Sequence, residues 1–123
     1  MTRWVVAELG PDVPMHFTAF HPDWRMRDIS TTPATTLKRA RDIAASAGLR
    51  YVYTGNIRDE ASQSTYCHGC GTCLIGRDGY TITSWGLDAS GHCTSCGEIC
   101  PGAFERDPES WGPRRAPLVF AAA

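Results

Sequence analysis

The sequence CHGCGTC (residues 67–73) and the sequence CTSCGEIC (residues 93–100) together contain all six cysteines of this 123-residue chain. Each begins with two cysteines that are separated by two residues and followed by glycine. This spacing lets two thiolates bind one ion if the backbone turns sharply, and glycine permits the positive φ that such a turn often uses. The pattern predicts a metal site with a structural zinc ion as the expected occupant. The predicted ligands are Cys67, Cys70, Cys93 and Cys96.

The residues between the two cysteine pairs predict a β-hairpin. Two short apolar stretches, LIG (residues 74–76) and YTITSW (residues 80–85), lie on either side of the dipeptide Asp78-Gly79, a standard hairpin signal. The interval is slightly longer than the about 15–20 residues usual in zinc ribbons. A hairpin here brings the two metal-binding turns together, so we expect residues 59–104 to form a zinc-ribbon-like β module.

Other assignments of the cysteines stay open. A disulfide framework is one, although paired cysteines without a secretion signal favour metal binding. An iron–sulfur cluster is another, because three clustered cysteines and a remote Cys100-Pro101 resemble a ferredoxin pattern. If four sulfurs bind one ion, Cys73 and Cys100 are expected to be bystanders, and His68 and His92 to face solvent.

Composition and charge argue against several classes of function. The net charge is −1, and the positive charges are scattered apart from an arginine pair in PRRAP (residues 113–117), so nucleic acid is not an expected partner. No apolar run approaches the about 20 residues that span a bilayer. The N-terminus has neither the long apolar region nor the cleavage site of a signal peptide. We therefore expect no membrane partner and a cytoplasmic location.

Residues 1–58 predict a βαβ unit. VVAELG (residues 5–10) is expected to end a helix at the glycine, and MHFTAF (residues 15–20) and RYVYTGN (residues 50–56) are expected to be strands. Between the strands, Thr32 is expected to cap a helix over residues 33–47. This order implies a parallel pair with a right-handed crossover.

Two parallel strands alone leave edges and faces uncovered, because such sheets are normally buried on both sides. We therefore expect residues 1–58 to belong to a larger α/β sheet or barrel, completed by a longer chain or by a protein partner. A polar linker over residues 58–65 separates this unit from the cysteine-rich module. Residues 105–123 are rich in proline and charge and are expected to be a disordered tail.

Several linked motifs add to this interpretation: PMHFTAFHP (residues 14–22), TP…TL…AR…A…AGLRYVYTGN, TYCHGCG (residues 65–71) and CTSCG…PGAF. Their combination resembles the C-terminal part of radical SAM enzymes of the AmmeMemoRadiSam system, which are similar to pyruvate formate-lyase activating enzymes. The resemblance covers about residues 3–104. It implies an α/β fold in which the βαβ unit is the terminal portion of a partial (β/α) barrel, followed by the zinc-ribbon-like module.

The resemblance also implies a chemistry, the reductive cleavage of S-adenosylmethionine and radical-based modification of a substrate that the sequence does not identify. In the family, the barrel strands carry an S-adenosylmethionine-bound [4Fe–4S] cluster at their C-terminal tips, and an upstream CxxxCxxC motif holds the cluster. Neither cysteine segment here has that spacing. This chain alone is therefore not expected to hold the cluster or to be active without the N-terminal half of the barrel.

The same resemblance assigns a role to one histidine. His21 follows the first predicted strand, where the loops of a barrel build sites, and related enzymes use a histidine near here to contact S-adenosylmethionine. The alternative is a loop histidine with local hydrogen bonds. His16 lies within the strand and is expected to pack in the barrel interior, and Asn56 either faces the same rim or forms a simple turn.

A second hypothesis comes from a different class of function. The chain is then a free-standing zinc-ribbon binding module or a rubredoxin-like electron carrier, with the βαβ unit as a docking element. A rubredoxin-like site binds iron with four sulfurs and is red when oxidised, which distinguishes it from zinc.

Overall fold

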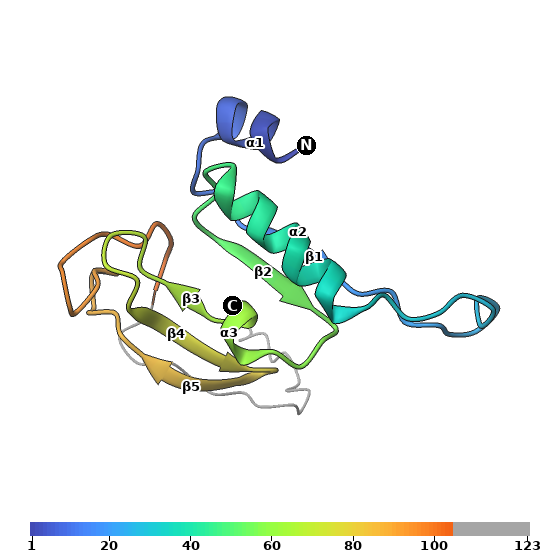
Figure 1. The fold of residues 1–123 in the computed structure, drawn as a ribbon. Helices are drawn as coiled ribbons and strands as arrows, with labels where there is room; N and C mark the ends of the chain where they lie inside the picture. Colours follow the sequence, from blue (N-terminus) through green and yellow to red (C-terminus); the bar gives the residue numbers. More distant parts are fainter. Residues whose placement is uncertain (105–123) are drawn as a thin grey trace, which may run out of the picture.

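The computed structural model, which describes residues 1–104, contains two small sheets and three helices within that range (Figure 1). Strands β1 and β2 form a parallel pair, and β3, β4 and β5 form an antiparallel sheet in that order. The chain is therefore a mixed α/β protein, as predicted. The elements are α1 (Thr2–Leu9), β1 (Met15–Thr18), α2 (Ala34–Ser46), β2 (Val52–Gly55), α3 (Glu60–Gln63), β3 (Thr65–Tyr66), β4 (Cys73–Asp78) and β5 (Thr81–Trp85).

Helix α2 covers one face of the parallel pair. The register pairs Met15 with Val52 and Phe17 with Thr54, and alternation along a strand puts these four side chains on one face. Ala44 of α2 is fully buried against this face. The apolar cluster beneath α2 consists of Val5, Ala44, Leu49 and Val52, with the partly buried Val6, Val13, Met15 and Phe17 around it.

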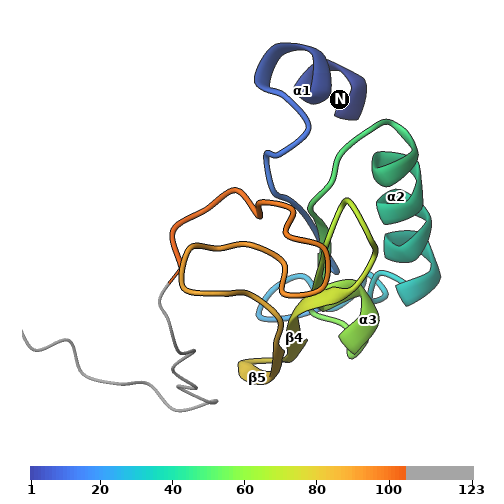
Figure 2. The same ribbon diagram turned by 90° about the vertical axis from the view of Figure 1, so that its left-hand side faces the viewer.

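The opposite face of the parallel pair is turned toward the cysteine-rich residues, so that α2 and the antiparallel sheet lie on different sides of β2 (Figure 2). Tyr51 and Tyr53 extend from this face. Tyr51 is buried among the residues of the antiparallel sheet rather than with α2. His16 pairs with Tyr53 in the register and stacks on it, with ring centroids 4.9 Å apart.

The antiparallel sheet contains the predicted hairpin. Strands β4 and β5 pair from Ile75 with Trp85 to Asp78 with Thr81, and the turn between them includes Gly79. The register shifts between Gly76 and Arg77. The core of this region consists of Tyr51, Cys67, Leu74, Ile75, Leu87, Cys93 and Cys100, with Tyr53, Ile82, Trp85 and Phe104 packed against it.

Two local predictions need correction. Thr32 does not cap α2: Pro33 is the N-cap, and the Thr32 hydroxyl instead accepts a hydrogen bond of 3.0 Å from the backbone N–H of Phe20. Residues 58–65 are not a structureless linker, because α3 and β3 begin within them. Helix α3 has four residues, about one turn, which is too short to show an apolar periodicity, and Ser62 within it contacts Thr54 of β2 through the two hydroxyl groups.

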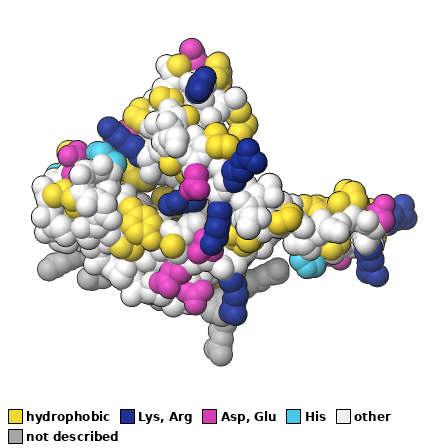
Figure 3. All heavy atoms as spheres, viewed as in Figure 1, with side chains coloured by type: hydrophobic (Ala, Val, Ile, Leu, Met, Phe, Trp, Pro, Cys, Tyr) yellow, Lys and Arg dark blue, Asp and Glu magenta, His cyan; other side chains and the backbone are white. Residues whose placement is uncertain are grey.

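The segment between β1 and α2 projects from the body of the molecule as an arm (Figure 1). It includes the exposed side chains of Trp24, Met26 and Ile29, and the guanidinium of Arg25 lies 4.5 Å from the centre of the Trp24 ring. On the face shown in Figure 3, positive and negative side chains are interspersed. Within residues 1–104, no helix has the length and apolar character to cross a bilayer. The predicted disordered tail lies outside the described residues.

Candidate metal centre

The sulfur atoms of Cys67, Cys70, Cys93 and Cys96 all lie within 4.8 Å of one another. Two separations are 3.6 Å, from Cys67 to Cys96, and 3.7 Å, from Cys70 to Cys93. All four are free thiols, since a disulfide needs sulfurs about 2.05 Å apart. The structure therefore brings together the four cysteines that the spacing singled out, and they form a group able to hold a metal ion.

The two cysteine turns have matching backbone hydrogen bonds. In the first, the N–H of Gly71 donates to the carbonyl of Cys67 over 2.9 Å; in the second, Gly97 donates to Cys93 over 2.8 Å. Both glycines have the positive φ expected of them, 75° at Gly71 and 79° at Gly97. Two copies of one local conformation thus aim their thiols at the same point, because the hairpin places them face to face.

The spacing of the sulfurs suits one tetrahedral ion. Zinc–sulfur bonds of about 2.3 Å in a tetrahedron put the sulfurs about 3.8 Å apart, close to the two separations above. A four-iron cluster does not fit. Such a cluster has to lie between its four thiolates, whereas these four sulfurs are within 4.8 Å of one another and leave room for one ion. Four thiolates accommodate zinc or a single iron ion.

The protonation of the thiols depends on their neighbours. Hydrogen bonds from the side chain and backbone of Thr72 lower the pKa of the Cys70 thiol to about 6. The backbone N–H of Glu98 is the largest single influence on Cys96 and favours its thiolate, but the sulfurs of Cys70, Cys67 and Cys93 and desolvation together outweigh it and raise the pKa of Cys96 to about 12. One negative charge therefore disfavours the next, and a divalent cation supplies the charge that lets all four thiols ionise.

His68 does not face solvent, and that prediction was wrong. Its side chain is 17% exposed, with Nε2 3.3 Å from Glu98 Oε1 and Nδ1 3.3 Å from the hydroxyl of Tyr51. Burial raises the pKa of this tyrosine well above its usual value, so the hydroxyl stays protonated. This contact joins both cysteine turns to the residue that precedes β2. No spacing in the sequence indicates it, because the three residues are far apart in the chain.

The other two cysteines lie outside the group of four sulfurs. Cys73 begins β4, and its sulfur is 3.7 Å from the hydroxyl of Ser84 on β5. Cys100 is buried, and burial raises the pKa of its thiol. His92 lies beside Asp88, with Nδ1 3.4 Å from Oδ1, and is likewise not among the four.

The residues predicted near the barrel rim, His21, Asn56 and His16, lie in three different surroundings. His21 is exposed in the arm after β1, and its role toward S-adenosylmethionine stays a prediction. Asn56 has the positive φ of a turn, 58°, and its side chain donates to the carbonyl of Ala19 over 3.2 Å, which joins the ends of the two parallel strands. His16 is exposed on the face opposite α2.

The chain matches no protein-family model and no solved structure. It is similar to the uncharacterised protein MJ0808 of Methanocaldococcus jannaschii, with 42% identity over 97 residues. The match covers 78% of this chain and 29% of that relative, so the chain spans less than a third of the length of the curated relative. The relative's name states no activity.

Proposed function

We propose that the four cysteines bind one structural zinc ion that stabilises the antiparallel sheet. The single observation that supports this is the sulfur geometry, with separations of 3.6 and 3.7 Å between thiols from two matching turns. Two of the four, Cys67 and Cys93, belong to the buried core of this sheet, so a bound ion would cross-link a region that is too small to be stabilised by apolar contacts alone.

Metal content and visible absorption of the anaerobically purified chain test this proposal. We expect one zinc ion per chain and no colour. A red protein with one iron ion per chain supports the rubredoxin-like alternative. The exposure of Cys70 and Cys96 favours this alternative, since an electron carrier needs its site near the surface. A brown protein with several irons and sulfide contradicts both.

We propose further that the chain is the C-terminal portion of a radical SAM enzyme, with β1, α2 and β2 as the last part of a partial (β/α) barrel. The linked motifs support this proposal, as does the parallel pair, because β1 and β2 hydrogen-bond only to each other within the described residues. The length of the relative, most of which lies outside the match, is consistent with a barrel half elsewhere in a longer protein. On this proposal the cluster and S-adenosylmethionine bind to that other half, and His21 contacts S-adenosylmethionine.

A chimera tests this enzyme proposal. The matched segment of the Methanocaldococcus protein is replaced by the corresponding residues of this chain, and reductive cleavage of S-adenosylmethionine is measured under anaerobic conditions. We expect cleavage by the relative and by the chimera, a loss in the chimera carrying His21→Ala, and none by this chain alone. If the relative neither holds an iron–sulfur cluster nor cleaves S-adenosylmethionine, the proposal is wrong.

A further inference from the structure

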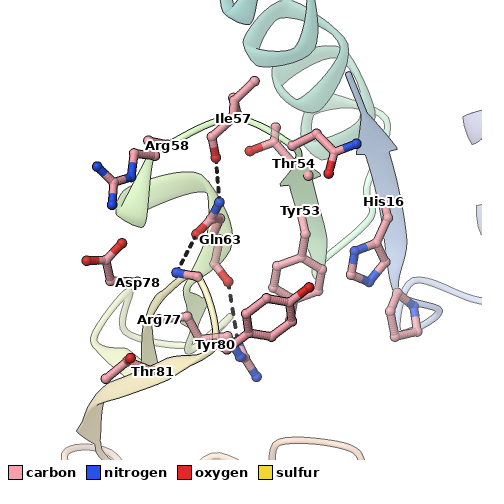
Figure 4. A pocket seen from close by; sticks show the side chains of 14 residues that line it. His16, Tyr53, Thr54, Ile57, Arg58, Gln63, Arg77, Asp78, Tyr80 and Thr81 are labelled. Carbon is pink, nitrogen blue, oxygen red and sulfur yellow. Dashed lines mark hydrogen bonds between the residues drawn. The ribbon is translucent and has the colours of Figure 1, made fainter. Parts of the chain in front are cut away.

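A cleft of about 1000 Å³ opens between the parallel pair and the tip of the β4–β5 hairpin (Figure 4). One wall comes from β1 and β2, with His16 and Tyr53, and the segment after β2 contributes Arg58. The opposite wall comes from the hairpin, with Arg77 and Tyr80. The volume is in the range of small-molecule sites, about 300–1000 Å³.

Arg77 is a half-buried cation without a carboxylate partner within the described residues. Its Nη1 donates to the Thr65 hydroxyl over 2.7 Å and to the Gln63 carbonyl over 3.4 Å, and both acceptors are neutral. Its carbon Cζ lies 5.8 Å from the centre of the Tyr53 ring. Neutral acceptors and a ring face orient the guanidinium but leave its charge uncompensated, and guanidinium groups of this kind pair with carboxylate or phosphate through two parallel hydrogen bonds.

The other groups of the cleft add positive charge and flat surfaces. Arg58 is exposed and forms no ion pair within residues 1–104. His16 offers a ring stacked on Tyr53, and Tyr80 is 80% exposed. Asp78 is the acidic residue of the lining, and in Figure 4 it lies on the side of Arg58, whereas the Arg77 guanidinium lies toward the two tyrosines.

We propose that this cleft binds a small molecule that carries a phosphate or carboxylate group on a planar ring. Arg77 pairs with the anionic group, Arg58 adds attraction, and the ring lies against Tyr80 and the stacked His16 and Tyr53. This inference does not depend on the radical SAM proposal or on the identity of the metal, because none of these residues belongs to the group of four cysteines.

Titration of the metal-loaded full chain with phenyl phosphate, benzoate and neutral phenol, followed by amide NMR shifts, tests the proposal. We expect saturable shifts at Tyr53 and at residues 77–81 with one or both anions and none with phenol. Tighter binding of phenyl phosphate identifies a phosphoester ligand, and tighter binding of benzoate identifies a carboxylate.

Three variants locate the binding. Arg77→Gln is expected to weaken binding by about tenfold or more, as the loss of a charge-assisted hydrogen bond predicts. Arg58→Gln and His16→Ala, at exposed positions, are each expected to weaken binding at least about threefold. These two variants test the proposal even if Arg77→Gln fails to fold. Arg39→Gln, an exposed arginine on α2, is the matched control and is expected to bind as wild type. The proposal is overturned if neither anion saturates binding at about 10 mM, or if Arg58→Gln and His16→Ala bind with unchanged affinity. Metal content is measured in all variants, and an unchanged value shows that the lost binding does not come from damage to the cysteine site.

Discussion

The βαβ unit (residues 1–58) and the cysteine-rich ribbon (residues 59–104) obtain their cores in different ways. Beneath α2 the buried residues are aliphatic side chains from three elements and a loop. In the ribbon, three of the seven buried core residues are cysteines, two of which belong to the group of four sulfurs. On the zinc proposal, this difference means that the ribbon depends on an ion for its stability, whereas the βαβ unit depends on apolar contacts.

The largest effect is expected from Cys67→Ser. It removes a buried sulfur from the group, and structural zinc contributes about 10–16 kcal/mol of binding free energy that is also folding free energy. We expect loss of bound metal and unfolding of the ribbon, while the amides beneath α2 stay protected in hydrogen exchange. Cys73→Ser is the matched control and is expected to keep one metal per chain. Full metal content in Cys67→Ser would contradict the four-sulfur assignment.

Two leucines sharpen the comparison at the next level. Leu74 in the ribbon is 1% exposed and Leu49 beneath α2 is 3% exposed, and each change to alanine costs about 2–5 kcal/mol. The metal-loaded ribbon is expected to survive Leu74→Ala, because the binding free energy of the ion is larger than this loss. Leu49→Ala is expected to unfold the βαβ unit, which has no cross-link. Urea unfolding followed by hydrogen exchange measures both, and equal loss of protection in the two variants would show that the ion gives no advantage.

A smaller effect is expected from Thr72→Val, which removes the hydroxyl near the Cys70 sulfur. That hydroxyl is one cause of the lowered pKa of Cys70, about 6, so the variant raises this pKa and protons compete better with the metal. We expect metal affinity to fall by up to about 10–100-fold, the usual cost of losing an outer partner of a metal ligand. In the wild type, affinity decreases as the pH decreases, and Cys70 joins the competition only below about pH 6.

Competition with a colorimetric chelator across pH 5–8 measures the affinities of the Thr72 experiment. Thr81→Val, an exposed strand position away from the sulfurs, is the control. Identical pH profiles for Thr72→Val and the wild type would show that the hydroxyl has no influence on the site.

The smallest effect concerns an ion pair between the two regions, from Lys38 of α2 to Asp59, with a nitrogen–oxygen distance of 3.1 Å. The pair is partly exposed, so a double-mutant cycle is expected to give about 0.2–1 kcal/mol at pH 7. Hydrogen bonds from Ser62 and then from Lys38 lower the pKa of Asp59. Because the pKa of Asp59 is lower in the native state than in the unfolded state, its ion pair stabilises the fold above the unfolded-state pKa. This stabilisation is lost as the pH falls through the native pKa of Asp59. A coupling energy that persists at pH 2 would contradict this ion pair.

Much of the local structure was predictable because it depends on short-range rules. The two Cys-x-x-Cys-Gly turns, the hairpin at Asp78-Gly79 and the strand–helix–strand order all follow from residue type and spacing, and the structure contains each of them. The error at Thr32 shows where such rules end. A hydroxyl before proline is a good helix cap, but the backbone N–H of Phe20 lies close to the Thr32 hydroxyl and donates its hydrogen bond to it.

The sequence by itself determined which four cysteines converge and which glycines let their turns form, because each Cys-x-x-Cys-Gly turn is a local conformation. Only the tertiary structure decided that Tyr51 leaves its own unit to enter the core of the ribbon, that His68 lies between Tyr51 and Glu98, and that Arg77 shares a cleft with His16. These contacts join residues far apart in the chain, and their partners are selected by burial and hydrogen bonding after the two sheets have packed. No periodicity encodes such partners, so their physical origin lies in the packing of the two sheets.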